Sequence, residues 1–170
     1  PKYISNTNLG LKRKQLKSHI AYDIGIKETA LILSKNLNAP LILSNFSRLI
    51  IDPNRSKNDP TSIMQIYDGV LILGNFNLAK SEIIERRKNF YDTYHDAIST
   101  FLRKKKNLTP CLISLHSFTP KLNLQLYRPW HVGVLWGPDR RMSDLVLSEL
   151  KRYNDICIGE NKPYSGNLKG

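Results

Sequence analysis

The chain has 170 residues, of which 26 are basic and 14 acidic, so its net charge is +12. This length is enough for one domain with a hydrophobic core, and a hydrophobic share of 41% excludes a disordered chain. No apolar run is long enough to span a membrane, which argues against an integral membrane protein.

The surplus of positive charge suits either a nucleic acid or a small anionic ligand. Basic residues cluster over 12–14 and 103–106, at apparent helix ends, where cations interact favourably with the helix dipole. Aromatic and basic residues are not interleaved in the way that stacks bases, so a nucleic-acid-binding module is the less favoured reading. Cys111 and Cys157 each begin an apolar stretch, which predicts buried free thiols and a reducing cytoplasm.

Apolar periodicity predicts an alternation of helices and strands. The predicted helical segments are 12–17, 22–37, 79–106 and 140–153. The predicted strands are 41–44, 48–52, 111–115, 132–136 and 156–158. The long polar segment between residues 53 and 78 contains Asp68-Gly69, which predicts a hairpin of 63–66 with 70–73. We therefore expect a single α/β domain over 1–170, with a central sheet flanked by helices on both faces.

The stretch Ser47-Arg48-Leu49-Ile50-Ile51-Asp52-Pro53-Asn54-Arg55 combines a buried strand with polar ends. Pro53 cannot donate to a strand ladder, so the strand should end by Asp52. Asn54 and Arg55 then follow a strand end, where scaffolds often present binding groups. The guanidinium fork of Arg55 suits a carboxylate, and the alternative is a solvated arginine beside an Asn in a turn.

Two further positions are candidates for metal binding. His116 ends a predicted buried strand, and the carboxyl ends of strands line the ligand crevice of α/β sheets. A neutral imidazole there can bind zinc, although a hydrogen-bonded structural histidine is the alternative. Asp23 follows His19 by four residues, so on a helix both would face one site. The alternative for Asp23 is a helix cap.

Other chemically capable residues have simpler interpretations. His95 lies in the long predicted helix beside Tyr94 and one turn from Tyr91, which favours a packed core histidine. Glu160 is interpreted as a solvated loop charge rather than a catalytic base.

Four motifs resemble the N-formylglutamate amidohydrolase family. They are the stretch from Ser47 to Arg55, His19-Ile20-Ala21-Tyr22-Asp23-Ile24-Gly25, His116-Ser117-Phe118-Thr119-Pro120 and Arg128-Pro129-Trp130-His131-Val132-Gly133. They occur in the order typical of the family and cover most of the chain. The family is similar in fold to the zinc carboxypeptidases and aspartoacylase, so the resemblance implies a zinc-carboxypeptidase-like mixed sheet (a phosphorylase/hydrolase-like fold).

The resemblance also implies a site with one divalent metal ion, Zn²⁺. It implies His116 and Asp23 as metal ligands, with His19 as a third ligand or as a residue that orients Asp23. The substrate-binding residues that it implies are Arg48, Asn54, Arg55, Ser117, Arg128, His131 and Tyr164. For Arg128 and His131, which flank Trp130, a rim packed by the Trp is an equal alternative. The match of Tyr164 rests on Asn161 and Pro163 nearby.

The resemblance further implies that the chain is truncated. The family's other metal histidine belongs to a motif upstream of His19, and its general base is a glutamate beyond Gly170. We therefore expect no catalytic acid or base within the chain, weak zinc binding and little turnover by this polypeptide alone.

The activity that the resemblance implies is hydrolysis of N-formyl-L-glutamate to formate and L-glutamate, in histidine degradation. The substrate would be a small anionic N-acyl amino acid. Other N-acyl amino acids or peptides are alternatives within the same class. This interpretation requires the imidazole of His116, the carboxylate of Asp23 and the guanidinium of Arg55 to converge on one cleft.

Overall fold

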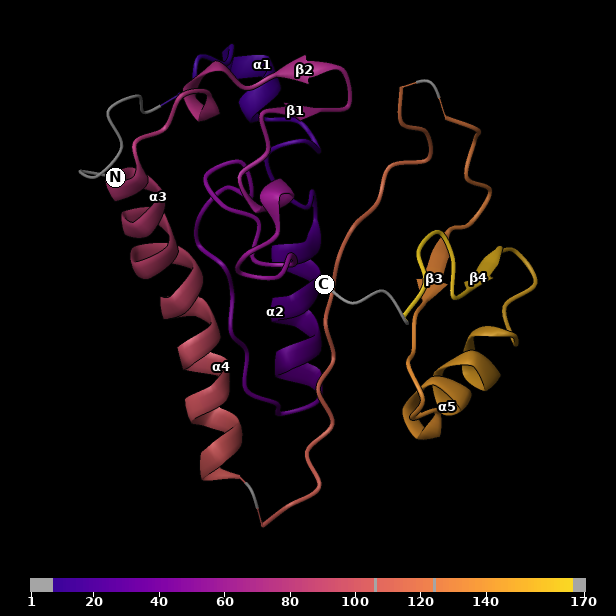
Figure 1. Cartoon of the computed structure of the whole chain (residues 1–170). Coiled ribbons are helices and arrows are strands. Elements are labelled where there is room, and N and C mark those ends of the chain that lie inside the picture. The colour runs from indigo at the N-terminus through magenta and orange to yellow at the C-terminus, as the bar shows by residue number, and fades with distance from the viewer. Residues whose placement is uncertain (1–7, 106, 124, 167–170) are drawn as a thin grey trace. The chain divides into compact units, whose positions relative to one another are not determined.

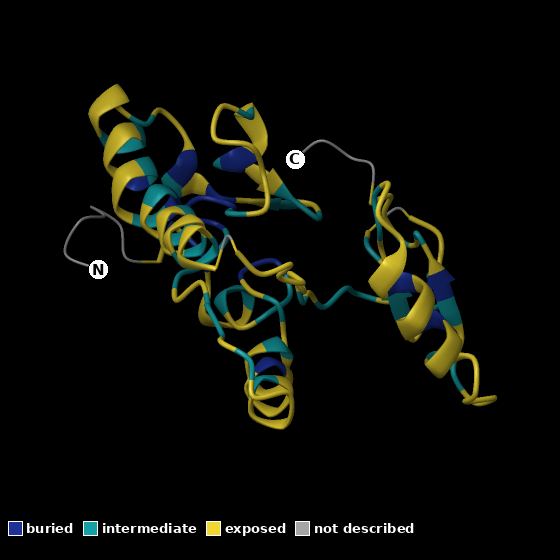
Figure 2. Cartoon of the chain, turned by 90° about the horizontal axis from the view of Figure 1, so that it is seen from below, coloured by how far each residue is buried: buried dark blue, intermediate teal, exposed yellow. Residues whose placement is uncertain are grey.

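The computed structural model describes residues 8–105, 107–123 and 125–166, and the chain divides into two compact units. The first unit spans Pro1–Phe118 and the second spans Thr119–Gly170. Figure 1 labels the elements of each unit, and Figure 2 shows that buried residues are a minority in both. No helix in the described ranges has the length and apolar character needed to cross a membrane.

The first unit is mainly helical and contains one small hairpin. Its elements are α1 (Arg13–Leu16), α2 (Ile26–Asn36), η1 (Pro60–Ser62), β1 (Ile66–Tyr67), β2 (Val70–Leu71), η2 (Leu73–Asn75), α3 (Lys80–Arg86), η3 (Arg87–Asp92) and α4 (Thr93–Lys104). Strands β1 and β2 pair antiparallel, and both turn residues, Asp68 and Gly69, have positive φ. The hairpin predicted around this pair is confirmed, with strands shorter than expected.

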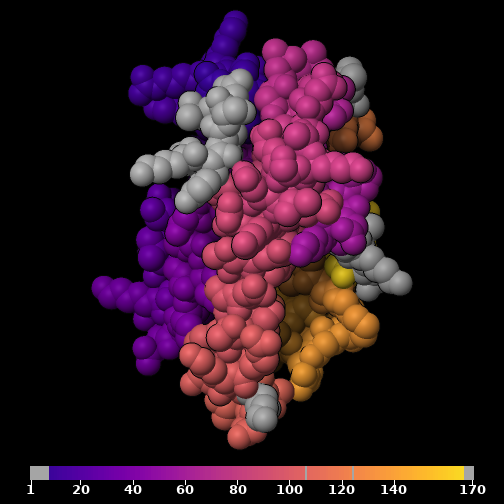
Figure 3. All heavy atoms as spheres, turned by 60° about the vertical axis from the view of Figure 1, so that its left-hand side comes forward, coloured from indigo at the N-terminus to yellow at the C-terminus, as the bar shows by residue number. Residues whose placement is uncertain are grey.

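The helices predicted for this unit also form, within narrower bounds. Helix α2 begins at Ile26 because Gly25, with φ 77°, interrupts the helical path just before it. The helix predicted over 79–106 forms as the continuous run of α3, η3 and α4, with a π-helical middle. This run lies along one face of the first unit (Figure 3).

A cluster of ten buried apolar side chains forms the core of the first unit. They are Leu9, Leu11, Ile20, Ala21, Leu49, Ile50, Ile51, Met64, Ile72 and Tyr91. The segment 49–51 is central, since Leu49 and Ile51 are 0% exposed. The middle of the Ser47–Arg55 stretch is therefore part of the core.

The strand predicted over 48–52 is wrong, although its burial is as expected. Residues 48–50 form a turn, so no ladder satisfies their buried backbone groups. Two buried side chains take its place. Asn75 Nδ2 donates to the Leu49 carbonyl at 2.8 Å, and Arg86 Nη1 donates to the Ile50 carbonyl at 3.1 Å.

The strands predicted over 41–44 and 111–115 are also wrong, because both segments are irregular. A strand requires a partner, and within the described ranges only β1 with β2 and β3 with β4 pair. Segment 111–115 has no neighbouring strand to cover its side chains, and Leu112 is 67% exposed. Cys111 is exposed for the same reason, which corrects the prediction of a buried thiol.

The second unit is a β–α–β arrangement of β3 (Val132–Val134), α5 (Arg141–Leu150) and β4 (Ile158–Glu160). The two strands are parallel, as expected when a helix connects them, and α5 packs against β3. The strands predicted over 132–136 and 156–158 and the helix over 140–153 are confirmed with shifted ends. Cys157 precedes β4 and is exposed, so the buried thiol expected there is also wrong.

Close backbone approach in the second unit requires glycine at one position. A Cβ on Gly133 would lie 2.3 Å from the carbonyl oxygen of Lys162, which is too close for any side chain. This contact brings the loop after β4 against β3.

The architecture is α/β, built from helices and two small sheets. No central sheet flanked by helices on both faces exists among the residues described, because each unit contains one two-stranded sheet. The likeness to zinc carboxypeptidases and the single-domain organisation stay predictions.

Candidate active site

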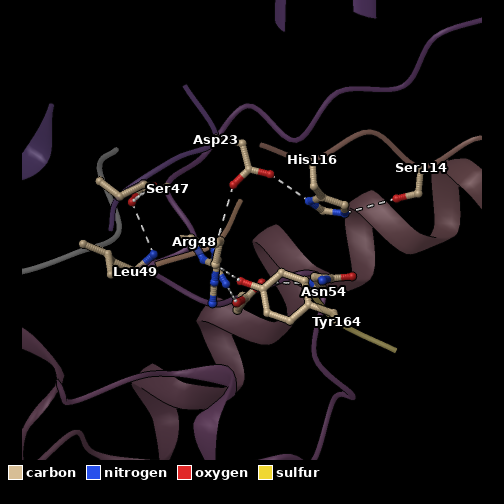
Figure 4. A network of polar contacts seen from close by, with 11 residues as sticks. Asp23, Ser47, Arg48, Leu49, Asn54, Ser114, His116 and Tyr164 are labelled. Atoms are coloured by element: carbon tan, nitrogen blue, oxygen red, sulfur yellow. Dashed lines mark hydrogen bonds and ion pairs between the residues drawn. The ribbon is translucent and has the colours of Figure 1, made fainter. Parts of the chain in front are cut away.

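Asp23 and His116 lie 93 residues apart in sequence and contact each other directly. His116 Nδ1 is 2.7 Å from Asp23 Oδ2, and its Nε2 is 3.1 Å from Ser114 Oγ (Figure 4). Because a carboxylate only accepts, the proton of a neutral imidazole lies on Nδ1, and Nε2 then accepts from the Ser114 hydroxyl. Both ring nitrogens are thus oriented, while half of the His116 side chain stays exposed.

Backbone contacts place Asp23 beside Arg48. Ser47 Oγ and Arg48 N both donate to the Ala21 carbonyl, at 2.7 and 3.2 Å. Two chain segments therefore run together here, and Arg48 Nη1 comes within 3.9 Å of Asp23 Oδ1. The same guanidinium lies over the Tyr67 ring, 5.2 Å from its centroid.

Arg48 is held more tightly by Asp52 than by Asp23. Its Nη2 donates to Asp52 Oδ2 at 2.5 Å. Burial lowers the pKa of Arg48, but the charge of Asp52 and this hydrogen bond outweigh it, so the pKa is raised above its ordinary value. Arg48 is therefore a permanent cation whose charge is already largely neutralised by two carboxylates.

Asp52 also organises the turn that follows it. It is only 2% exposed, and its Oδ1 accepts from Asn54 N at 3.0 Å. Its own carbonyl accepts from Arg55 N at 3.2 Å. These bonds form an Asx-type turn, so the side chains of Asn54 and Arg55 are exposed. No described side chain forms a hydrogen bond or ion pair with the Arg55 guanidinium.

His19 has a different partner from the other predicted metal ligands. Its Nε2 is 3.0 Å from Asp68 Oδ2. The helix face that was expected to join His19 to Asp23 does not form, because residues 17–25 make turns. Asp23 instead reaches His116 and Arg48.

The remaining predicted site residues lie near Phe118 or in the second unit. Ser117 is half-buried next to His116. In the second unit, Arg128 Nη1 donates to the Tyr164 hydroxyl at 3.2 Å, and the guanidinium lies over the Tyr164 ring. His131 Nδ1 accepts a hydrogen bond from Cys157 N at 2.8 Å.

His95 and Glu160 were interpreted from the sequence as a packed core histidine and a solvated loop charge. His95 is half-buried and hydrogen-bonded to the Pro53 carbonyl at 3.0 Å. Glu160 is exposed and pairs with Lys151 at 2.7 Å.

The donor set at Asp23 and His116 fits a divalent cation in part. A carboxylate and an imidazole are both zinc ligands, and a metal ion could replace the proton that they share. No group of three or more such side chains occurs among the described residues, however, whereas catalytic zinc usually takes three protein ligands. The net charge of Asp23, Asp52 and Arg48 is −1, which favours a cation.

Sequence reasoning missed the residues that hold this site together. The sequence analysis places Asp52 only at a strand end, although an Asp before Pro-Asn is a common turn former. Tyr67 and Tyr91 act through contacts with distant segments, at Arg48 and at the Arg55 carbonyl, and no local pattern identifies them. Ser114 contacts His116 two residues away.

One comparison with known proteins names a family. The sequence model of the family described as N-formylglutamate amidohydrolase matches residues 2–169. A search of curated proteins gives no match. Among solved structures, the crystal structure of gene product Atu2144 from Agrobacterium tumefaciens is similar, with a TM-score of 0.85 and 30% sequence identity. The match covers 94% of this chain and 63% of that chain, so this chain spans less than two thirds of its length.

The family match covers nearly the whole chain and includes all four motifs. The chain therefore belongs to the N-formylglutamate amidohydrolase family.

Proposed function

We propose that this chain carries the substrate-binding part and two metal ligands of an enzyme that hydrolyses N-formyl-L-glutamate to formate and L-glutamate. The observation that supports it most is a continuous series of contacts that runs from His116 through Asp23, Arg48 and Asp52 to the turn at Asn54. A candidate cation site and a candidate anion site are thereby tied into one framework. An N-acylated dicarboxylate needs both, one at its amide and one at a carboxylate.

Asp23 and His116 are the residues that would hold the metal ion. When bound, zinc would supply a Lewis acid that polarises the formyl carbonyl and activates water. Ser114 would keep the His116 ring in place, because a hydrogen bond to the ring nitrogen that does not bind the metal fixes the orientation of a metal-bound histidine. His19 is engaged with Asp68, so we leave it out of the ligand set.

Arg55 is the residue that would bind the substrate carboxylate. Its guanidinium is exposed, whereas that of Arg48 is already engaged by Asp52 and lies near Asp23. A planar fork of donors binds a carboxylate with two parallel hydrogen bonds. Asn54 would add a neutral donor beside it, and Arg48 would support the turn through Asp52.

The reaction needs the water, the formyl carbon and the carboxylate to be held in fixed relation. The C–N bond of the formamide breaks, the water oxygen bonds to the formyl carbon, and the leaving amine of glutamate takes a proton that the water gives up. The contribution of this chain is the positioning of both substrate ends.

The test is release of the free amino acid by the full-length protein with zinc and N-formyl-L-glutamate, against a panel of N-formyl-L-aspartate, N-formyl-L-methionine and N-acetyl-L-glutamate. We expect N-formyl-L-glutamate to have the highest kcat/KM. A better substrate with another acyl group or amino acid would replace the specificity claim. Absence of hydrolysis of every member would reject the proposed function.

A further inference from the structure

Two side chains of the continuous helical run formed by α3, η3 and α4 hold the backbone on either side of Asn54. His95 Nε2 donates to the carbonyl of Pro53 at 3.0 Å, and the Tyr91 hydroxyl donates to the carbonyl of Arg55 at 2.9 Å. Since a carbonyl only accepts, His95 must carry a proton on Nε2. The exposed side chains of Asn54 and Arg55 therefore project from a backbone that is anchored on both sides.

The two donors support each other. The ring centroids of Tyr91 and His95 lie 4.2 Å apart, and the Tyr94 ring meets the His95 ring edge-on with 5.3 Å between centroids. Burial, reinforced by the charge of Asp92 and opposed by that of Lys57, raises the pKa of Tyr91. Its hydroxyl thus stays protonated and remains a donor at neutral pH.

The π-helical segment η3 explains how one helix reaches the whole segment from 50 to 55. Arg86 and Tyr91 are five residues apart, a spacing that places them on different faces of an α-helix. The i to i+5 pattern of a π-helix brings them to one side, and His95 follows one α-helical turn later. Arg86 Nη1 then donates to the Ile50 carbonyl, as the other two donate further along the segment.

We propose that Tyr91 and His95 are positioning residues that hold the Asn54–Arg55 turn in the conformation that receives a substrate carboxylate. This inference rests on the proposed function, in which the side chains of Asn54 and Arg55 bind the substrate carboxylate. A guanidinium that is fixed before the substrate arrives loses less conformational freedom on binding. Loss of either anchor should therefore weaken binding of the carboxylate and leave the chemical step nearly unchanged.

The experiment compares Tyr91→Phe, His95→Phe and His95→Gln with Tyr94→Phe in the full-length protein. Tyr91→Phe removes only a hydroxyl, and His95→Gln keeps an N–H donor of similar reach. Tyr94→Phe is the matched control, because it changes a neighbouring ring that contacts His95 without removing an anchor. The readouts are KM and kcat for N-formyl-L-glutamate, the Kd of L-glutamate by calorimetry, and Tm.

We expect Tyr91→Phe and His95→Phe to raise KM and the Kd of L-glutamate by about 3- to 10-fold, the effect of one lost hydrogen bond. We expect kcat to stay within about twofold, His95→Gln to restore most of the affinity, and Tyr94→Phe to behave like the wild type. Unchanged KM and Kd in both Phe variants would overturn the positioning role. A fall in kcat and Tm without a change in Kd would also overturn it, because that result describes a purely structural role.

Two substrate analogues show which carboxylate the turn holds. N-formyl-L-glutamine lacks the side-chain carboxylate, and the α-amide of N-formyl-L-glutamate lacks the other. The KM penalty of Tyr91→Phe should disappear with one analogue and persist with the other, and its persistence with both would contradict the inference. If the wild type binds L-glutamate but hydrolyses nothing, the proposed function fails and the Kd values still test the anchors. If it does not bind L-glutamate, both fail.

Discussion

Polar side chains lie inside the core of the first unit, whereas the ion pairs of the second unit lie at its surface. Arg86 is 1% exposed and bonds two carbonyls, Asn75 and Glu82. The Arg141–Asp139 pair of the second unit is, by contrast, 77% and 61% exposed. Buried hydrogen bonds fix backbone conformation because breaking one leaves a polar group without water, while exposed pairs are screened by water.

This difference explains why the candidate site is ordered without regular strands. The backbone of residues 49–55 is fixed by hydrogen bonds from Asn75, Arg86, Tyr91 and His95. A turn held in this way can present Asn54 and Arg55 as firmly as a strand end would. Substitutions in the buried network and among the exposed pairs should therefore differ in their effects.

The largest effect on stability is expected from Arg86→Met. It removes the donor to the Ile50 and Gly74 carbonyls and leaves Asn75 Oδ1 without its partner. We expect the free energy of unfolding to fall by about 3–5 kcal/mol in urea denaturation. The matched change in the second unit, Arg141→Met, should cost less than about 0.5 kcal/mol. Similar losses at both positions would refute the contrast between the units.

Arg55→Ala tests whether the ordered turn binds the anion. Loss of a charge-assisted bidentate contact should raise KM for N-formyl-L-glutamate by about 10- to 100-fold. Arg55→Lys should recover only part of this loss, since an ammonium cannot make the paired contact. Arg140→Ala, an exposed change in the second unit, serves as the control. A KM for Arg55→Ala within about twofold of wild type would place the carboxylate elsewhere.

Gly133→Ala tests how far backbone packing stabilises the second unit. The added methyl would meet the Lys162 carbonyl oxygen at 2.3 Å, so β3 or the loop after β4 must move. We expect a loss of about 1–3 kcal/mol, measured by thermal unfolding. Gly133 is not among the glycines with positive φ, so the loss reports the clash and not backbone strain. An unchanged Tm would mean that the close contact with Lys162 adds nothing.

The smallest effect is expected at Asp139. Hydrogen bonds from the Arg141 side chain and backbone, with its charge, lower the pKa of Asp139 to about 2. The native state therefore binds fewer protons than the unfolded state below the ordinary pKa. The small stabilisation is complete above the ordinary value and is lost as the pH falls through about 2. Arg141→Gln should move the pKa of Asp139 upward in an NMR titration; an unchanged pKa would mean that the ion pair does not form in solution.

Local signals account for the parts of the fold that the sequence predicted well. Helical periodicity located α2, the α3–α4 run and α5, and the Asp68-Gly69 pair located the hairpin. The strands over 41–44, 48–52 and 111–115 were not predictable in the same way, because strand formation depends on a partner and apolar residues alone do not supply one.

The same distinction between local sequence signals and contacts with distant segments applies to the site residues. The motifs named Asp23 and His116, and the structure brings these two together across 93 residues. They could not show that His19 pairs with Asp68 or that His95 supports the turn at Asn54, because both contacts depend on how distant segments pack. Buried Arg86 was equally invisible, since an arginine in a helix is usually exposed.

In the function that we propose, Asp23 and His116 hold a divalent cation close to the turn at Asn54. This role can be measured as zinc affinity, by competition with a chromogenic chelator, in the full-length protein and in Asp23→Asn and His116→Gln. We predict that each change weakens zinc binding by more than about 100-fold, while Asp144→Asn in the second unit leaves it unchanged. Zinc binding of wild-type strength in both variants would show that Asp23 and His116 are not metal ligands.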